Sequence, residues 1–266
     1  MLPILVVNPN TTKAMTDGLK PLLKGFVGSS ALPPPTFFTA PEGVPSINNG
    51  EDCHQSADLV FPHLISPSPS SSSSSSSPSL LDSHSAVLIA CYSVHPLVSL
   101  LKAHLSSRNI PPKPILGIFE ASLLESLSLL AGSPPSDQFG IVTTGAVWEK
   151  LLCDGVADFL GAEGKSSKRF AGVATTGLSA LELHDAPAEE VKTRLKDATK
   201  SLIRKSAQGG GRLRAVCLGC AGMAGMDETV REACIGQLGE QEGAAVAIVD
   251  GVEAGYALLE GQVRMG

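Results

Sequence analysis

The feature that most constrains the fold of this chain is a regular alternation of short apolar runs with longer amphipathic segments. The apolar runs have strand length and end in small or polar residues; they cover residues 4–7, 86–90, 115–119, 140–144, 169–174, 215–219 and 245–250. Helical periodicity covers 96–105, 121–131, 147–160 and 188–205. Strands that alternate with helices form parallel βαβ units, and uninterrupted apolar strands are covered on both faces. The pattern therefore predicts an α/β fold.

Size and charge narrow the class of protein. The chain has 266 residues, 43% of them hydrophobic, which is enough to bury the core of one large domain or two smaller lobes. A formal net charge of -6 with scattered Lys and Arg offers no basic surface, so we expect no nucleic-acid partner. The N-terminal apolar run is too short for a signal peptide, and no stretch is long enough to cross a bilayer. We therefore expect a cytoplasmic protein without membrane contact.

Residues 66–79 consist almost entirely of Ser and Pro. Such a segment cannot bury enough apolar surface to offset the entropy of ordering it. We expect a mobile surface insertion between a helix that ends near Leu64 and the strand that starts at 86.

Two strand segments resemble each other position by position. Ala-Val-Leu-Ile-Ala-Cys at 86–91 matches Ala-Val-Cys-Leu-Gly-Cys at 215–220, and each run delivers a Cys at its carboxyl end. A weaker similarity relates 4–12 to 140–145, where a strand again gives way to amide or hydroxyl residues. The two pairs predict two similar lobes that face each other.

The cysteines at these two strand ends are the main candidates for chemistry. Ligands of open parallel sheets bind beyond the carboxyl ends of the strands, where Cys91 and Cys220 lie. A helix N-terminus beside each thiol is expected to lower its pKa toward neutrality. One thiolate can then remove a proton from one face of a carbon while the other thiol delivers a proton to the opposite face. The pair predicts inversion of configuration at a substrate carbon.

Small polar residues near the same strand ends fit a substrate with carbonyl or carboxylate oxygens. Hydroxyls, amides and freed backbone N–H groups can hold such oxygens and stabilise the enolate left when a proton departs. The set comprises Asn8, Asn10, Thr11, Thr12, Ser93, Thr143, Thr144 and Gly222. Each of them taken singly is explained equally well as a helix cap or turn residue. Their shared location favours a binding shell, with Tyr92, His95 and Ala221 beside the thiols as further candidates.

The other cysteines are compatible with different chemistry. Cys217 and Cys220 form a C-x-x-C, which is typical of a redox dithiol or half of a zinc site. However, Cys217 lies inside an apolar strand, where residues three apart point to opposite faces. No second C-x-x-C or paired His motif completes a site, so we expect no metal. The remaining thiols, Cys53, Cys153 and Cys234, are interpreted as structural residues on helices or loops.

Two alternative functions remain compatible with the pattern. Cys91 could act as a nucleophile with His95 as its base, because a separation of four residues on a helix places both on one face. This alternative predicts an amidohydrolase and leaves Cys220 without a role. A non-catalytic protein that binds a small molecule on the same scaffold is the other alternative, since a fold does not fix a function.

Four blocks of the sequence resemble the aspartate/glutamate/hydantoin racemase superfamily. They are Val-Val-Asn-Pro-Asn-Thr-Thr-Lys-Ala-Met-Thr at 6–16, Leu-Ile-Ala-Cys-Tyr-Ser-Val-His-Pro-Leu at 88–97, Gly-Ile-Phe-Glu-Ala at 117–121 and Leu-Gly-Cys-Ala-Gly-Met-Ala at 218–224. The blocks cover nearly the whole chain. They are most similar to the hydantoin and allantoin racemase group, including fungal members linked to allantoin use.

The resemblance implies a fold and an activity. The fold is two pseudo-symmetric flavodoxin-like lobes, each a parallel sheet flanked by helices, with the active site in the cleft between them. We expect residues 1–118 plus 225–266 in the first lobe and 119–224 in the second. The activity is that of a cofactor-independent isomerase in which Cys91 and Cys220 are the acid/base pair. Its small-molecule substrate is allantoin or a 5-substituted hydantoin, and the chain is expected to form a homo-oligomer.

The resemblance also bears on the substrate. Asn10, Ser93, Thr143 and Gly222 are similar to the oxygen-binding shell of the family. An Asp or Glu racemase, or a decarboxylase or isomerase of the same fold, is the alternative within the superfamily. Free aspartate or glutamate calls for strong carboxylate anchoring, and no Arg or Lys lies at a strand end. The sequence departs from bacterial relatives through the Ser/Pro tract and through Val-His-Pro at 94–96, where those relatives often carry an Asp and a Pro.

Overall fold

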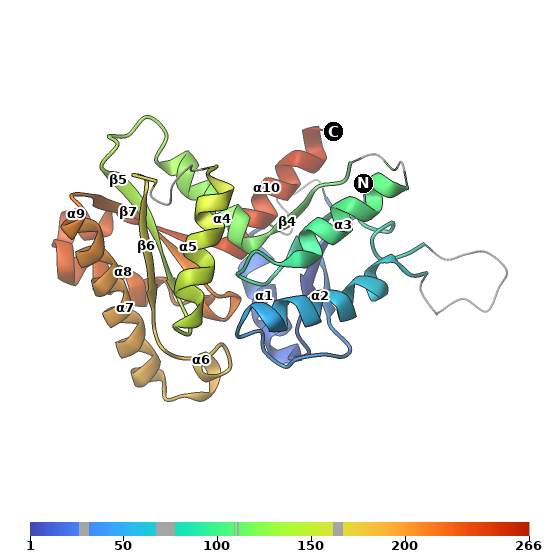
Figure 1. Cartoon of the computed structure of the whole chain (residues 1–266), viewed down its shortest axis with the longest axis horizontal. Helices are drawn as coiled ribbons and strands as arrows, with labels where there is room; N and C mark the ends of the chain where they lie inside the picture. Colours follow the sequence, from blue (N-terminus) through green and yellow to red (C-terminus); the bar gives the residue numbers. More distant parts are fainter. Residues whose placement is uncertain (27–31, 68–77, 109, 111, 162–166, 266) are drawn as a thin grey trace. The chain divides into compact units, whose positions relative to one another are not determined.

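The computed structural model describes residues 1–26, 32–67, 78–108, 110, 112–161 and 167–265. It contains two four-stranded parallel sheets, with the strand orders β2-β1-β3-β4 and β6-β5-β7-β8. Figure 1 labels β5, β6 and β7 of the second sheet together with the helices around them. The chain divides into two compact units: Met1–Cys91, His95–Ile118 and Gly255–Gly266 form the first, and Tyr92–Val94 and Phe119–Ala254 form the second. The predicted α/β fold, with two parallel sheets flanked by helices, is confirmed.

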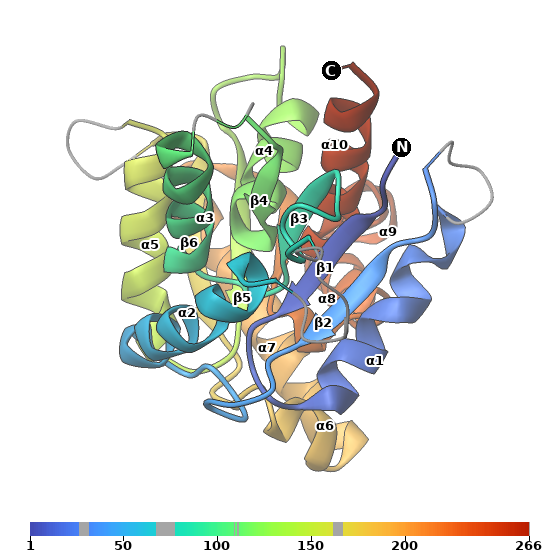
Figure 2. The ribbon, with the colours of Figure 1, turned by 90° about the vertical axis from the view of Figure 1, so that its right-hand side faces the viewer.

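The first unit is built on a sheet whose two central strands are buried along their whole length. Its elements are β1 (Ile4–Asn8), α1 (Lys13–Leu22), the 3-10 turn η1 (Leu23–Gly25), β2 (Thr36–Thr39), α2 (Gly50–Ile65), β3 (Ala86–Ile89), α3 (Pro96–Ser107), β4 (Ile115–Gly117) and the end of α10 (Gly251–Met265). β1 and β2 lie side by side in parallel register (Figure 2). Alternate residues of β1 and β3, among them Val7 and Ile89, pack in one apolar cluster with Val60 of α2 and Leu101 of α3.

The second unit repeats this plan. Its elements are α4 (Ile118–Leu129), β5 (Asp137–Thr143), α5 (Val147–Phe159), β6 (Phe170–Thr175), α6 (Glu182–Asp185), α7 (Ala188–Gln208), β7 (Arg212–Gly219), the 3-10 turn η2 (Ala221–Met223), α8 (Asp227–Leu238), α9 (Glu240–Ala244) and β8 (Ala247–Asp250). Val142 of β5 and Leu218 of β7 pack with Leu202 of α7 and Val230 of α8 in the apolar core of this unit.

The two sheets have equivalent strand orders. In each unit the first strand has the second strand on one side and the third on the other, so β1 and β3 correspond to β5 and β7. Where the order of an open parallel sheet reverses in this way, a crevice forms at the carboxyl ends of the two central strands. The similar segments at 86–91 and 215–220 therefore contain equivalent strands, β3 and β7.

Among the differences from the sequence prediction, three concern the edge of the first sheet and the division into units. The edge strand β2 was not predicted, because its residues are exposed or half-buried and leave no continuous apolar signal. The apolar run expected as a strand over 115–119 ends as a strand at Gly117, and α4 begins at Ile118. The chain returns to the first unit at Gly255 and not at 225, because β8 pairs with β7 through Leu218 and Asp250 and completes the second sheet.

The Ser/Pro segment is described only at its flanks. Residues 68–77 of the expected insertion lie outside the described residues, and Pro67 and Ser79 form an isolated antiparallel bridge. Among the helices that the structure describes, none combines the length and the apolar character required to span a bilayer.

Candidate active site

Cys91 lies just beyond the carboxyl end of β3, beside the turn that follows β1. The register pairs Val7 with Ile89, and the Ala90 N–H donates to the Val7 carbonyl at 2.8 Å. Both segments therefore meet at the carboxyl end of the sheet, where a crevice forms in such folds. Cys91 is half-buried, and its sulfur is not part of a disulfide.

Side-chain amides shape the turn after β1. Asn8 Nδ2 donates to Asn10 Oδ1 at 3.0 Å, and the Thr12 N–H donates to the same oxygen at 2.9 Å. Asn10 Nδ2 donates to the Met15 sulfur at 3.2 Å, which is a weak acceptor, so this amide group can turn toward a stronger one. Thr11 and Thr12 bond to the loop after β2, through the Thr11 N–H at 3.0 Å and the Thr12 hydroxyl at 2.7 Å. Of these residues, Asn10 is best suited to contact a substrate oxygen.

Two further side chains converge on Cys91. The sulfurs of Cys53 and Cys91 and one ring nitrogen of His95 all lie within 4.8 Å of one another. Cys53 comes from α2 and His95 is the N-cap of α3. The sequence pattern left Cys53 on a helix or a loop as a structural residue, and it did not show that α2 brings this thiol to Cys91.

The hydrogen bonding of His95 decides its chemical role. Its Nδ1 accepts the Leu97 N–H at 3.3 Å, so the neutral ring carries its proton on Nε2. Burial, together with nearby His54, lowers the pKa of His95 to about 4, so the ring is neutral at pH 7. Nε2 is buried and has no hydrogen-bond partner among the described residues. A ring in this state donates a proton and does not accept one, which argues against His95 as a base for Cys91.

Cys220 follows β7 directly. It therefore lies at the carboxyl end of the second sheet, as Cys91 does in the first. It is the N-cap of η2, and its sulfur accepts the Gly222 N–H at 3.3 Å. The expectation that a helix N-terminus lowers the thiol pKa is wrong here. Burial raises the pKa of Cys220 to about 11, and the N–H groups of Gly222 and Met223 offset only part of this effect. A turn of three residues has too small a dipole to overcome desolvation. The thiol is therefore protonated at neutral pH and suited to donate a proton.

Two adjacent strands of the second sheet end in the same tripeptide, Thr-Thr-Gly, at 143–145 and 175–177. The Thr143 hydroxyl donates to the Gly219 carbonyl at 2.6 Å and so fixes the chain just before the second thiol. The Thr176 N–H donates to the Thr143 carbonyl at 2.8 Å. Thr176 is buried at the same carboxyl end of the sheet. It was not among the predicted site residues, although the repeated tripeptide could have identified it.

The remaining candidates lie beside the two thiols. Ser93 and Thr144 are buried polar residues, and Ala221 opens η2. Tyr92 has a different role, because its hydroxyl forms a buried hydrogen bond of 2.7 Å with the Ser122 hydroxyl. Tyr92 therefore supports the core of the second unit.

The sulfurs of Cys217 and Cys220 have different hydrogen-bond partners. Cys217 is fully buried in β7, where its sulfur hydrogen-bonds with Ser126 Oγ at 3.1 Å, whereas Cys220 bonds to the backbone of η2. Within the described residues, the group with metal-ligand spacing is the Cys53, Cys91 and His95 cluster. The sequence expectation of no metal site rested on motifs and did not foresee this cluster.

A buried carboxylate ends β8, which sequence reasoning did not single out. Asp250 is 7% exposed, and its Oδ1 accepts the Val252 N–H at 2.7 Å and the Glu253 N–H at 3.2 Å. Burial is the largest influence on the pKa of Asp250 and raises it, with Asp227 adding to the rise and the two N–H donors opposing it.

We expect Asp250→Asn to stabilise the protein at neutral pH. A carboxyl whose pKa is higher in the folded state than in the unfolded state weakens folding as pH rises through that range. Asn keeps the capping oxygen and removes the charge. Urea unfolding should give a larger free energy for the variant at pH 7 and a smaller difference near pH 4. An unchanged difference at the two pH values would contradict this electrostatic explanation.

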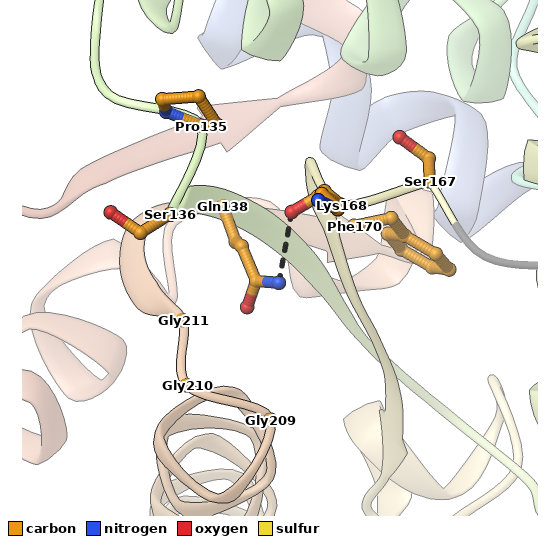
Figure 3. Close-up of a pocket in the computed structure, with 9 residues that line it drawn as sticks. All are labelled: Pro135, Ser136, Gln138, Ser167, Lys168, Phe170, Gly209, Gly210 and Gly211. Atoms are coloured by element: carbon orange, nitrogen blue, oxygen red, sulfur yellow. Dashed lines mark hydrogen bonds between the residues drawn. The ribbon is translucent and has the colours of Figure 1, made fainter.

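A cavity of about 490 Å³ lies elsewhere in the second unit (Figure 3). It is lined by Pro135, Ser136, Gln138, Ser167, Lys168, Phe170, Gly209, Gly210 and Gly211. These residues precede or begin β5, β6 and β7, so the cavity lies at the amino ends of the strands. The thiol of Cys220 lies at the opposite, carboxyl end of β7. The cavity is therefore not the candidate active site.

Comparisons with known proteins give a consistent family. A family model described as Asp/Glu/Hydantoin racemase matches residues 4–259. An uncharacterised protein of Schizosaccharomyces pombe is 34% identical over 100% of this chain and 93% of its own length. The hydantoin racemase of Pseudomonas sp. strain NS671 is 26% identical over 100% of this chain and 87% of its own length. The crystal structure of allantoin racemase from Pseudomonas fluorescens has a TM-score of 0.72 at 24% identity, covers 100% of this chain and 92% of that chain, and supports the fold.

Proposed function

This chain belongs to the Asp/Glu/Hydantoin racemase family, and from that premise we propose that it inverts the Cα of a hydantoin-type substrate by proton transfer between Cys91 and Cys220, without a cofactor. One observation carries the proposal. The two thiols follow equivalent strands, β3 and β7, of two sheets with equivalent order. Each thiol thus lies at the carboxyl end of the strands, where parallel sheets bind ligands.

The proposed reaction transfers one proton on each face of the carbon. The thiolate of one cysteine takes the Cα proton, and the electron pair moves into the adjacent carbonyl to form an enolate. The thiol of the other cysteine then protonates the opposite face and becomes the thiolate. Asn10 in the first unit, and the Thr144 hydroxyl and the Gly222 N–H in the second unit, are the groups proposed to hold the substrate oxygens. The Gly222 N–H would share its bond to the Cys220 sulfur with such an oxygen.

The polar residues at the strand ends favour an uncharged ring over a dicarboxylate. The polar side chains in the turns after β1, β3, β5 and β7 are those of Asn, Thr, Ser, Cys, Tyr and His95, which is neutral at pH 7, and these turns contain no Arg or Lys. Lys13, the first residue of α1, is exposed and paired with Asp17 at 2.8 Å. Such turns can hydrogen-bond to the carbonyls of a hydantoin, and they supply no cation to pair with the carboxylates of aspartate. Allantoin and 5-substituted hydantoins are therefore the proposed substrates. We also propose that the chain forms a homo-oligomer, as the resemblance to the family implies.

A circular dichroism assay of the substrate tests this function. We expect one enantiomer of allantoin or of a 5-substituted hydantoin to lose its circular dichroism signal to zero in the presence of the protein, with no change in composition by mass. Aspartate is expected to react far more slowly. Hydrolysis of the ring would support the Cys91 and His95 amidohydrolase instead, and an unchanged signal with every hydantoin would refute the racemase.

A further inference from the structure

Cys91 belongs to a cluster that proton transfer does not use in full. Cys53, Cys91 and His95 bring two sulfurs and a ring nitrogen within 4.8 Å of one another, all inside the first unit. Cys53 is 4% exposed and His95 is 2% exposed. Moving a proton at the substrate requires only Cys91 from this group. The convergence of the other two side chains on that thiol therefore indicates a second property of the site.

We propose that Cys53, Cys91 and His95 form a binding site for a thiophilic cation such as Zn²⁺, and that the bound ion withholds Cys91 from catalysis. The inhibitory half of this proposal rests on the proposed racemase function. The binding half does not.

The spacing of the three side chains fits a tetrahedral ion after a small contraction. Zinc lies about 2.3 Å from a thiolate sulfur and about 2.0 Å from an imidazole nitrogen, which places pairs of ligand atoms roughly 3.5 Å apart. Separations of at most 4.8 Å need to shorten by little more than ~1 Å. Rotation of the two cysteine side chains can supply this change. Three protein ligands leave the fourth position to water, as in zinc sites that remain accessible.

Regular structure holds the three ligands in place. Cys53 lies on α2, and one turn further along this helix Ser56 Oγ donates to the Pro9 carbonyl at 2.6 Å, which ties the helix to the turn after β1. His95 directly precedes α3 and is buried, so the surrounding packing restricts its ring. α2 and α3 share one apolar core with β3. The ligands are therefore arranged before an ion arrives, which lowers the entropy cost of binding.

The hydrogen bond from the Leu97 N–H to His95 opposes metal binding, and the cost of losing it can be estimated. The Nδ1 of His95 is occupied and Nε2 has no partner among the described residues, so Nε2 is the nitrogen available to an ion. Binding there moves the ring proton to Nδ1 and breaks the bond from Leu97. Loss of one capping bond reduces affinity by on the order of tenfold. Zinc bound by several thiolate and imidazole ligands gains many more orders of magnitude, and the thiol protons leave to solvent.

Titration of the purified full chain with Zn²⁺ or Co²⁺ tests the binding half directly. The matched variants are Cys53→Ser, which removes a ligand, and Cys153→Ser, which removes a half-buried thiol of α5 outside the cluster. A phosphine reductant keeps Cys53 and Cys91 from forming a disulfide. We expect the wild type and Cys153→Ser to bind one ion per chain, with a thiolate-to-cobalt absorption band. We expect Cys53→Ser to bind at least about 100-fold more weakly.

Racemisation measured in the same samples tests the inhibitory half. Zn²⁺ should inhibit the wild type and Cys153→Ser, and a chelator should restore both, whereas Cys53→Ser should remain active in zinc. Circular dichroism checks that Cys53→Ser is folded, and Cys53→Ala serves as a second variant if it is not. Equal metal affinity in the wild type and the folded Cys53 variant would overturn the site, as would the absence of binding. Metal binding without racemase activity on any substrate would refute the proposed function and leave the metal site standing.

Discussion

Replacement of either strand-end thiol is expected to lower racemisation by at least about 100-fold, the lower end of what a positioned acid or base contributes. The remaining sulfur can still remove a proton from its own face and return one to the same face. We therefore expect Cys91→Ala to exchange the Cα proton of one enantiomer for deuterium without inversion. Cys220→Ala should do the same for the opposite enantiomer. Proton NMR of each enantiomer in D₂O measures both effects.

The matched control for this experiment is Cys153→Ala, which removes a thiol from α5 and should racemise at the wild-type rate. Full turnover by Cys220→Ala would contradict the two-thiol reaction and favour a reaction at Cys91 alone. Exchange of the same enantiomer by both cysteine variants would also contradict it, because the two thiols would then act on one face.

Gly219→Ala is expected to have the second largest effect, because this glycine closes β7 directly before Cys220. A Cβ at this position would lie 2.7 Å from Thr143 Cβ and 2.7 Å from the Val142 carbonyl oxygen. Backbone cannot give way cheaply, so we expect a loss of about 1–3 kcal/mol in the free energy of unfolding. The displaced strand end moves Cys220, and misplacement of a catalytic group by about 1 Å can cost roughly 100-fold in rate. Thermal unfolding and kcat/KM together measure the two consequences.

Gly236→Ala provides the control for the glycine experiment. Gly236 lies in α8, and a Cβ there meets no atom within 4 Å. Alanine in a helix interior is expected to raise stability by about 0.5–1 kcal/mol and to leave activity unchanged. If Gly219→Ala behaved in the same way, the close approach of β5 and β7 would not be what positions Cys220.

Much of the fold was predictable because the signals were local and strong. Buried parallel strands such as β1 and β3 are uninterrupted apolar runs, and the repeated strand with a terminal Cys identified β3 and β7 as equivalent. The edge strand β2 escaped prediction because half-exposed residues give no such run. The boundary at 225 was wrong because strand pairing, here β8 with β7, is a contact between segments that the sequence pattern does not encode.

The sequence pattern placed the candidate thiols at strand ends, but it did not give their pKa values or their neighbours in space. Strand pattern alone places Cys91 and Cys220 at carboxyl ends, because chain direction fixes which end of a parallel strand meets a ligand. It could not give the raised pKa of Cys220, which depends on burial. It also could not show that Cys53 approaches Cys91, since that contact depends on how α2 packs against the sheet.

The most direct test of the two-thiol account is the isotope content of both enantiomers early in a reaction in D₂O. Starting from one protiated enantiomer of allantoin, the account predicts that the inverted product carries deuterium from the second thiol while the remaining substrate stays protiated. Mass spectrometry after chiral separation gives both contents. Protium in the inverted product, or deuterium entering the remaining substrate as fast as product forms, would show that one group serves both faces and would contradict the account.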